Sequence, residues 1–269
     1  MDLITVKIEE LISSEIIEQL NNNKIEATSD GIENVLLKMY ELIPDNKRIS
    51  YGRVHTVKVL SKYLFDRKVD VEKIKKLFYQ TDNWYAKSTA LGILSHFAVD
   101  DYEAYLPFFE CAAIDNNWDV REMAQMFFRK LIKKYPEPIQ EYLFRLTKSK
   151  DENIRRFVSE TIRPVCENQW FQKKPEYSLK ILKQLFKEKS AYPRTSVGNN
   201  LSDLARHNPE LIYKIIKELV DSGDKNSYWI AYRACRNLVK KEPKRVMDLL
   251  KVDEYKYKNA KYIRSNNGN

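Results

Sequence analysis

Similar segments recur along this chain at intervals of about one helical pair, and this repetition limits the possible fold more than any other feature. NWYAKSTALGIL begins at Asn83 and NWDVREMAQMFF begins at Asn117, so the same Asn-Trp pair returns after 34 residues. NIRRFVSETIRP from Asn153, YPRTSVGNNLSDL from Tyr192 and YWIAYRACRNLVKK from Tyr228 follow at similar intervals. Such a period is typical of stacked helical pairs, in which each pair covers the apolar face of its neighbour. We therefore predict an all-α chain, an α-solenoid of HEAT-like repeats.

Composition and the spacing of apolar residues also favour helices. Six glycines and nine prolines in 269 residues are too few for the frequent turns of a β-sandwich or barrel. Segments such as VEKIKKLFYQ and SLKILKQLFKE place apolar residues three and four positions apart, which is the helical period. Polar breaks such as QTDN and KSKDEN can cap the helix that follows. We expect one repeat domain over residues 1–258, with residues 1–50 as an atypical N-terminal cap and residues 259–269 as a disordered tail.

Charge and cysteine content narrow the class of protein. The 47 Lys and Arg residues outnumber the 38 Asp and Glu residues, and a net charge of +9 favours a polyanionic partner such as nucleic acid. Cys111, Cys166 and Cys235 lie far apart and have no close Cys or His, which predicts neither a disulfide framework nor a zinc site. No apolar run approaches membrane-spanning length, and the N-terminus does not resemble a signal peptide. We expect a cytoplasmic protein without membrane association.

In a stack of helical pairs, the second helix of each pair lines the inner, concave face. Polar residues of the repeated segments would then line one curved, basic groove: Trp118, Glu122, Arg156, Glu160, Asn199, Asn200, Asp203, Arg233 and Arg236. Carboxylates repel a phosphate backbone, so the three acids in this set need an explanation. They either pair with neighbouring arginines as structural ion pairs or take part in chemistry.

Four motifs, in order, point to a known family. NWDVREMAQ, IRRFVSETIRP, RTSVGNNLSDLARHNPE and YWIAYRACRNLVKKEP together resemble the AlkC/AlkD superfamily of HEAT-like DNA alkylation repair glycosylases, and they lie closer to the AlkC branch. The resemblance covers residues 83–243. It implies a monomer that needs no cofactor, binds double-stranded DNA containing alkylated bases, and associates with the nucleoid when bound. The bases would be 3-methyladenine, with 3-methylcytosine and 7-methylguanine as further candidates.

The resemblance also implies roles for individual residues. Glu122 takes the position of the principal catalytic carboxylate, and Glu160 and Asp203 take the positions of other active-site acids. Trp118 matches an aromatic residue beside the lesion in the AlkD branch, although its recurrence at Trp84 also fits a packing role. The expected contacts to the lesion or its sugar are Trp118, Asn199 and Asn200, and the expected contacts to the DNA backbone are Arg156, Arg194, Arg233 and Arg236. The C-terminal immunoglobulin-like domain of some AlkC proteins is expected to be missing.

The implied reaction explains why acids would occupy a basic groove. Cleavage of a glycosidic bond develops an oxocarbenium ion, which a fixed carboxylate stabilises. A cationic alkylated base is already a good leaving group, so a general acid is not required. Two alternatives stay open. One is a catalytically silent HEAT-repeat protein that binds structured or damaged DNA, and the other is a protein-interaction solenoid with an acidic peptide partner.

Overall fold

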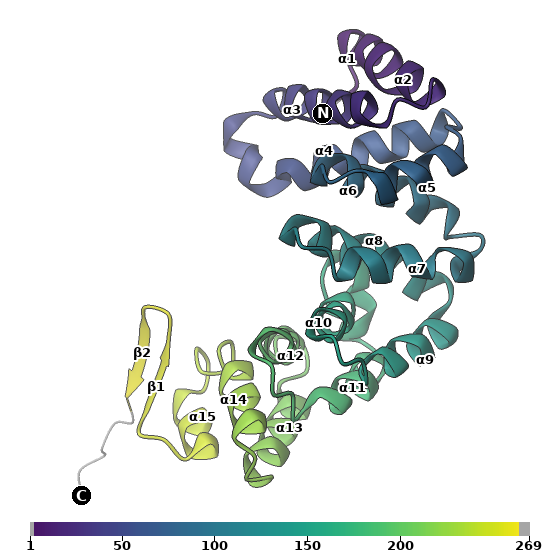
Figure 1. Cartoon of the computed structure of the whole chain (residues 1–269). Coiled ribbons are helices and arrows are strands. Elements are labelled where there is room, and N and C mark those ends of the chain that lie inside the picture. The colour runs from purple at the N-terminus through teal and green to yellow at the C-terminus, as the bar shows by residue number, and fades with distance from the viewer. Residues whose placement is uncertain (1–2, 264–269) are drawn as a thin grey trace, which may run out of the picture. The chain divides into compact units, whose positions relative to one another are not determined.

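A computed structural model describes residues 3–263 of the chain, without the side chains of residues 49–51. Its contacts form two compact units, Met1–Lys134 (unit 1) and Tyr135–Asn269 (unit 2), and helices dominate both (Figure 1). The prediction of an all-α fold of helical repeats is confirmed. One domain over residues 1–258 and a single curved basic groove stay predictions, and each unit is described by itself. No helix within residues 3–263 is long and apolar enough to span a bilayer.

Unit 1 consists of helical pairs. Its elements are α1 (Val6–Leu11), a π-helical turn η1 (Ile12–Ile17), α2 (Glu18–Asn21), α3 (Ile25–Glu41), α4 (Asp45–Asp66), α5 (Val71–Gln80), α6 (Trp84–Phe97), α7 (Tyr102–Ala113) and α8 (Trp118–Lys134). Helix α4 packs on α6, and α6 packs on α8, so the second helices of the pairs form one row (Figure 1). The first helices α3, α5 and α7 pack against this row.

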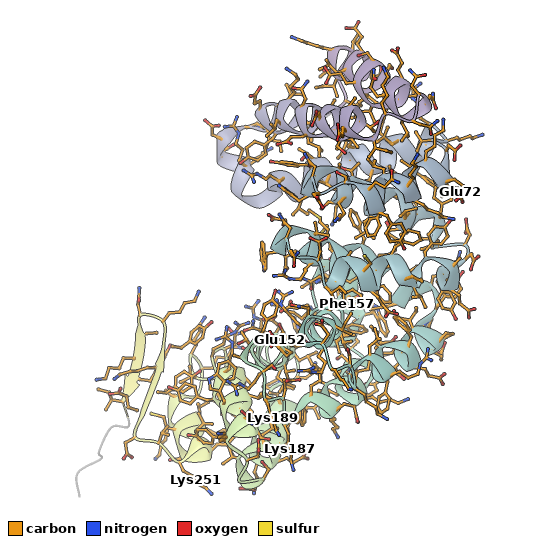
Figure 2. All side chains as sticks on the ribbon, viewed as in Figure 1. Glu72, Glu152, Phe157, Lys187, Lys189 and Lys251 are labelled. Atoms are coloured by element: carbon orange, nitrogen blue, oxygen red, sulfur yellow. The ribbon has the colours of Figure 1, made fainter. Side chains whose placement is uncertain are left out.

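Unit 2 repeats the arrangement. Its elements are α9 (Pro136–Leu146), α10 (Glu152–Thr161), a 3-10 turn η2 (Cys166–Gln172), α11 (Glu176–Leu182), η3 (Lys183–Leu185), α12 (Ala191–Leu204), α13 (Pro209–Asp221), α14 (Lys225–Ala234), α15 (Pro243–Leu250), β1 (Glu254–Tyr257) and β2 (Ala260–Ile263). The second helices α10, α12 and α14 lie side by side. Figure 2 labels Phe157, which is buried in α10, and Glu152, which lies exposed at the start of the same helix.

The repeated sequence signals are largely helix-start signals. Asn83, Asp151 and Asp224 accept hydrogen bonds from backbone N–H groups in the first turns of α6, α10 and α14. Each such cap stabilises its helix by about 1 kcal/mol. Arg121 and Arg155, which are 34 residues apart, each donate from Nη1 to two backbone carbonyls of the loop before their own helix. The spacing of the repeats therefore reflects how each second helix begins.

The N-terminal section is more helical than its polar sequence indicated. Helix α3 starts at Ile25, inside the polar stretch NNNKIEATSDG. Thr28 and Ser29 are buried in this helix, and a Cβ at Gly31 would lie 2.2 Å from the backbone oxygen of Glu15 in η1. Gly31 allows the close approach of α3 and η1, and the hydroxyls of Thr28 and Ser29 donate to Lys24 O and Thr81 Oγ1, so polarity here does not mark a loop. The capping role of residues 1–50 stays a prediction.

The predicted disordered tail was wrong for residues 259–263, which belong to a β-hairpin. Strands β1 and β2 pair antiparallel, with Tyr257 opposite Ala260. Tyr255 is fully buried, its ring stacks on Tyr232 of α14 at 4.4 Å, and its hydroxyl donates to the Tyr232 backbone oxygen at 2.9 Å. This anchoring by tyrosines escapes a search for helical apolar periodicity. The rest of the predicted tail, residues 264–269, lies outside the described residues.

Gly92 in α6 allows three second helices of unit 1 to approach one another. A Cβ at this position would lie 2.2 Å from Ser61 Oγ of α4 and 2.8 Å from Phe127 Cζ of α8. We expect Gly92→Ala to lower the free energy of unfolding by about 1–3 kcal/mol, because overpacking outweighs the better helix propensity of alanine. Urea unfolding measures this change. Adding Ser61→Ala should recover part of the loss, and an unchanged single variant would contradict the close approach.

His96 makes unit 1 sensitive to acid. Its half-buried ring stacks on Phe65, and burial, followed by the nearby Lys130 and Lys62, lowers its pKa from 6.5 to about 4. Between these two pH values the unfolded chain binds the proton more readily, so unfolding becomes easier as the pH falls from 6.5 towards 4. We expect His96→Phe to flatten this part of the stability profile measured by denaturant unfolding. A pH profile that is unchanged in His96→Phe would contradict this role of His96.

Candidate functional site

The residues predicted for the site fall into two groups. Trp118 and Glu122 lie on α8 of unit 1. The others lie on the second helices of unit 2: Arg156 and Glu160 on α10, Arg194, Asn199, Asn200 and Asp203 on α12, Arg233 on α14, and Arg236 just after α14.

In unit 1, the α8 group places an aromatic ring and a carboxylate on one helical face. Trp118 begins the helix and is 54% exposed, and the half-buried Glu122 follows one turn later. The Glu122 carboxylate accepts a hydrogen bond at 2.5 Å from the side-chain amide of Gln125. Trp84, at the equivalent repeat position, instead stacks on Tyr85 at 3.8 Å. Trp84 therefore has a packing role, whereas the ring of Trp118 is exposed.

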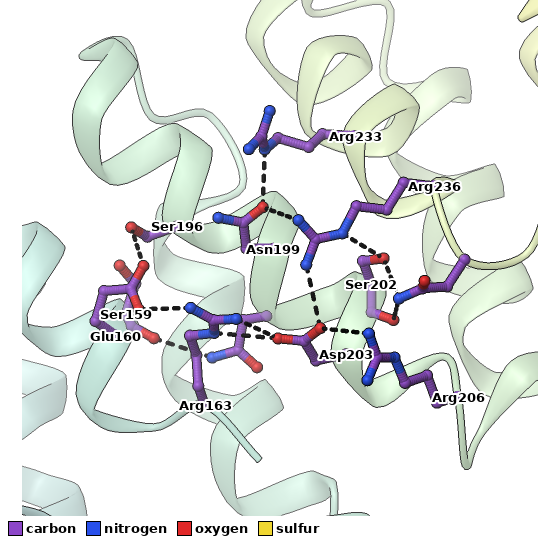
Figure 3. Close-up of polar contacts among 12 residues, drawn as sticks. Ser159, Glu160, Arg163, Ser196, Asn199, Ser202, Asp203, Arg206, Arg233 and Arg236 are labelled. Atoms are coloured by element: carbon purple, nitrogen blue, oxygen red, sulfur yellow. Dashed lines mark hydrogen bonds and ion pairs between the residues drawn. The ribbon is translucent and has the colours of Figure 1, made fainter. Parts of the chain in front are cut away.

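In unit 2, Glu160 and Asp203 meet through an arginine (Figure 3). Arg163 donates from Nη1 to Glu160 at 2.9 Å and from Nη2 to Asp203 at 2.5 Å. Arg236 contacts the other Asp203 oxygen at 3.1 Å, and the hydroxyl of Ser196 donates to Glu160 at 2.6 Å. Glu160 is only 5% exposed. The predicted acids of this unit are thus brought together as members of one ion-pair network.

The charge balance within this network favours permanent ion pairing. Burial alone lowers the pKa of the Arg163 guanidinium, but the Glu160 and Asp203 carboxylates outweigh burial and raise that pKa above its ordinary value. A guanidinium held in this way stays charged at every physiological pH. Glu160 and Asp203 therefore have the geometry of structural ion pairs, which was one of the two explanations for acids in a basic groove. Their catalytic role stays a prediction.

The predicted backbone-binding arginines lie over aromatic rings of unit 2. The guanidinium of Arg156 lies 4.4 Å from the ring centre of Tyr192, and that of Arg194 lies 4.9 Å from the ring centre of Trp229. Arg233 lies 5.6 Å from the same Trp229 ring. Stacking holds a guanidinium in place while its N–H edges remain able to donate hydrogen bonds. Contact of these arginines with DNA stays a prediction.

Arg233 adds positive charge that the network does not balance. Its Nε donates to Asn199 Oδ1 at 2.9 Å, and Arg236 donates to the same oxygen at 2.6 Å (Figure 3). Within residues 3–263 no carboxylate forms an ion pair with Arg233, and burial, together with the neighbouring Arg236 and Arg163, lowers its pKa. An anion near Arg233 would relieve this repulsion.

The two predicted asparagine contacts have structural positions. Asn200 is fully buried, and its amide donates to the backbone oxygen of Ser159 at 3.0 Å, which joins α12 to α10. This burial gives Asn200 a structural position between the two helices, and its contact with the lesion or sugar stays a prediction. Asn199 orients Arg233 and Arg236 through one oxygen, and its contact with a lesion stays a prediction.

Two residues at the centre of these groups were not predicted. Arg163 stands three residues after Glu160, and Gln125 stands three residues after Glu122. Residues at this spacing meet on a helix surface, so the spacing alone could have indicated both contacts. Arg163 even lies inside the quoted motif IRRFVSETIRP, in which Arg156 and Glu160 were assigned roles.

Comparison with known proteins assigns the chain to a sequence family. Residues 52–238 match the sequence family described as DNA alkylation repair enzyme. The chain belongs to the DNA alkylation repair enzyme family. This match confirms the AlkC/AlkD placement and covers both groups of site residues. The curated relative YhaZ of Bacillus subtilis, an uncharacterized protein, is 32% identical over 120 residues, which is 42% of this chain. The match covers 31% of YhaZ, so this family member spans about a third of that relative's length.

Solved structures share the fold of this DNA alkylation repair family member. AlkD2 from Streptococcus mutans is 23% identical with a TM-score of 0.58, over 76% of this chain and 98% of that one. The alkylpurine DNA glycosylase AlkC of Pseudomonas fluorescens, bound to DNA containing an abasic site analog, is 17% identical with a TM-score of 0.56, over 90% of this chain and 64% of that one. The two scores do not separate the branches, so the closer likeness to AlkC stays a prediction.

Proposed function

We propose that this protein is a DNA glycosylase that excises cationic N-alkylated bases, 3-methyladenine first among them, by hydrolysing the N-glycosidic bond with the aid of Glu122. The observation that carries the proposal is the α8 group. A half-buried carboxylate lies one turn after a highly exposed tryptophan, in a chain of the DNA alkylation repair enzyme family. A P. fluorescens relative in fold is an alkylpurine DNA glycosylase, which supports the same chemistry here.

The chemistry requires little beyond these two side chains. As the bond between the sugar and the base breaks, positive charge develops on the sugar, and the Glu122 carboxylate stabilises that charge and orients the attacking water. The alkylated base leaves as a neutral molecule, so no proton has to be donated. The exposed Trp118 ring offers a surface against the sugar or an unstacked base, and such stacking contributes roughly 1–3 kcal/mol.

The test is direct release of the base. The protein is incubated with methylated duplex DNA, and the released bases are separated and quantified. Release of 3-methyladenine above the spontaneous rate supports the proposal. If no base is released under conditions in which the duplex is bound, the proposal fails.

A second candidate function, binding of structured or damaged DNA without catalysis, is favoured by the unit 2 network. Glu160 and Asp203, two of the three predicted acids, are already paired with Arg163 and Arg236, so they need no chemical role. The surplus positive charge at Arg233 suits a phosphate regardless of the base attached to it. Under this candidate, wild-type protein binds branched and nicked duplexes, and none of the alkylated bases is released.

Arg233 provides a test of DNA binding that is independent of catalysis. We expect Arg233→Gln to weaken duplex binding about three- to tenfold and to reduce the slope of log affinity against log salt by about one, because one phosphate contact is lost. Arg245→Gln is the matched control. Its guanidinium also stacks on a tyrosine, Tyr213, but is neutralised by Glu210. Fluorescence anisotropy over a salt series measures both variants, and equal effects would contradict a phosphate contact at Arg233.

A further inference from the structure

A chain of hydrogen bonds along α8 ends on the proposed catalytic carboxylate. It joins Arg129, Gln125 and Glu122, whose spacings of four and three residues place them on one face of the helix. Gln125 is only 2% exposed and Arg129 only 9% exposed. Buried polar groups are costly unless their partners are in place, so these two side chains depend on the contacts that they make.

The amide of Gln125 has one favourable orientation in this chain. Its Nε2 donates to Glu122 Oε2 at 2.5 Å, and its Oε1 accepts from Arg129 Nη2 at 3.3 Å. A carboxylate only accepts hydrogen bonds and a guanidinium only donates them. Reversing the amide would place oxygen against oxygen at one end and N–H groups against N–H groups at the other. Glu122 and Arg129 therefore favour the same orientation of the Gln125 amide.

A neutral donor suits a carboxylate that has to stabilise a developing cation. Asp203 receives hydrogen bonds from Arg163 and Arg236, and their positive charges offset its own. Gln125 donates to Glu122 from a neutral amide, so this hydrogen bond itself adds no positive charge. A carboxylate that is fixed before the reaction needs no reorganisation when the oxocarbenium ion forms.

We propose that Gln125, held by Arg129, is a positioning residue for Glu122. The inference rests on the proposed function, since it assigns Gln125 the task of orienting the carboxylate that faces the sugar. Gln125 is too buried to touch DNA and acts through Glu122 alone.

Gln125→Met tests this role, because methionine has a similar length and keeps the apolar contacts but cannot donate to Glu122. We expect the single-turnover excision rate to fall about tenfold, the loss typical of a hydrogen bond to a charged group. The affinity for lesion-containing duplex should stay within about twofold, since no DNA contact is removed. Ile132→Val, a mild change at a buried position later in α8, is the matched control and should leave the rate unchanged.

A double-mutant cycle separates positioning from general destabilisation. In a Glu122→Gln background, Gln125→Met should cause no further loss of excision, because there is no carboxylate left to orient. A second tenfold loss in that background would overturn the inference. Arg129→Met provides a second variant, and it should lower the rate by a smaller factor because the amide retains its contact with Glu122.

A binding measurement gives a readout that does not need catalysis. Duplexes containing either a cationic azasugar or a neutral tetrahydrofuran abasic-site analogue are compared, and wild-type protein should prefer the cationic one. Gln125→Met should reduce this preference several-fold, and an unchanged preference would overturn the inference. Absence of base release by the wild type would instead reject the proposed function, so the two failures are distinguishable.

Discussion

Glu122→Gln is expected to lower the rate of 3-methyladenine excision at least about a hundredfold, the scale of loss seen when one preorganised charge-stabilising group is removed from an active site. Glutamine keeps the size of the side chain, so the half-buried position on α8 should stay filled. The negative charge is lost, and with it the stabilisation of the oxocarbenium ion. Single-turnover release from a duplex with one lesion measures the effect.

Two comparisons make this result specific to the site. Duplex affinity of Glu122→Gln should change less than about threefold, because removing a negative charge does not weaken attraction to phosphate. Glu72→Gln makes the same chemical change on the exposed face of α5, and it should leave excision unchanged (Figure 2). Excision that persists undiminished in Glu122→Gln would contradict the proposed role.

Arg163→Met is expected to lower the free energy of unfolding of unit 2 by about 3 kcal/mol, the scale of loss when one partner of a buried ion pair is removed. Arg163 joins Glu160 and Asp203, and its removal leaves Glu160 almost fully buried without its nearest cation. Denaturant unfolding at neutral pH measures the loss.

Arg206→Met is the matched control for Arg163. Arg206 approaches Asp203 only to 4.0 Å and is mostly exposed, so its loss should cost less than about 0.5 kcal/mol. Combining Arg163→Met with Glu160→Gln should recover much of the stability, because the buried carboxylate that lost its nearest cation is gone, while Asp203 keeps its ion pair with Arg236. If the single and double variants were equally unstable, the cost would come from lost contacts of the Arg163 stem instead.

Local signals account for the parts of the fold that could be predicted. The Asn-Trp and Asp-Glu segments mark helix starts because an Asn or Asp side chain caps the first turn, and this contact involves neighbours in sequence. The hairpin could not be predicted in the same way. Tyr255 is held by Tyr232, which lies 23 positions earlier, and such a contact leaves no periodic trace.

The candidate site could be predicted from the sequence only where its residues lie on a single helix. Trp118 and Glu122 follow one another along a single helix, so their common face could be inferred from spacing. The environment of Asp203 depends on Arg163 and Arg236, which belong to other repeats. Which arginines meet Asp203 is decided by packing between repeats, and the motifs contain no information about it.

The arginine and aromatic pairs of unit 2 form one series along the second helices and the hairpin. Arg156 depends on a ring from the next second helix, and Arg194 depends in turn on Trp229 of the helix after that. The guanidinium of Arg233 lies over the ring of Tyr257 in strand β1, so the last ring of the series does not come from a helix. Loss of the hairpin would leave the Arg233 guanidinium without the Tyr257 ring, so the hairpin serves as the terminating member of the series.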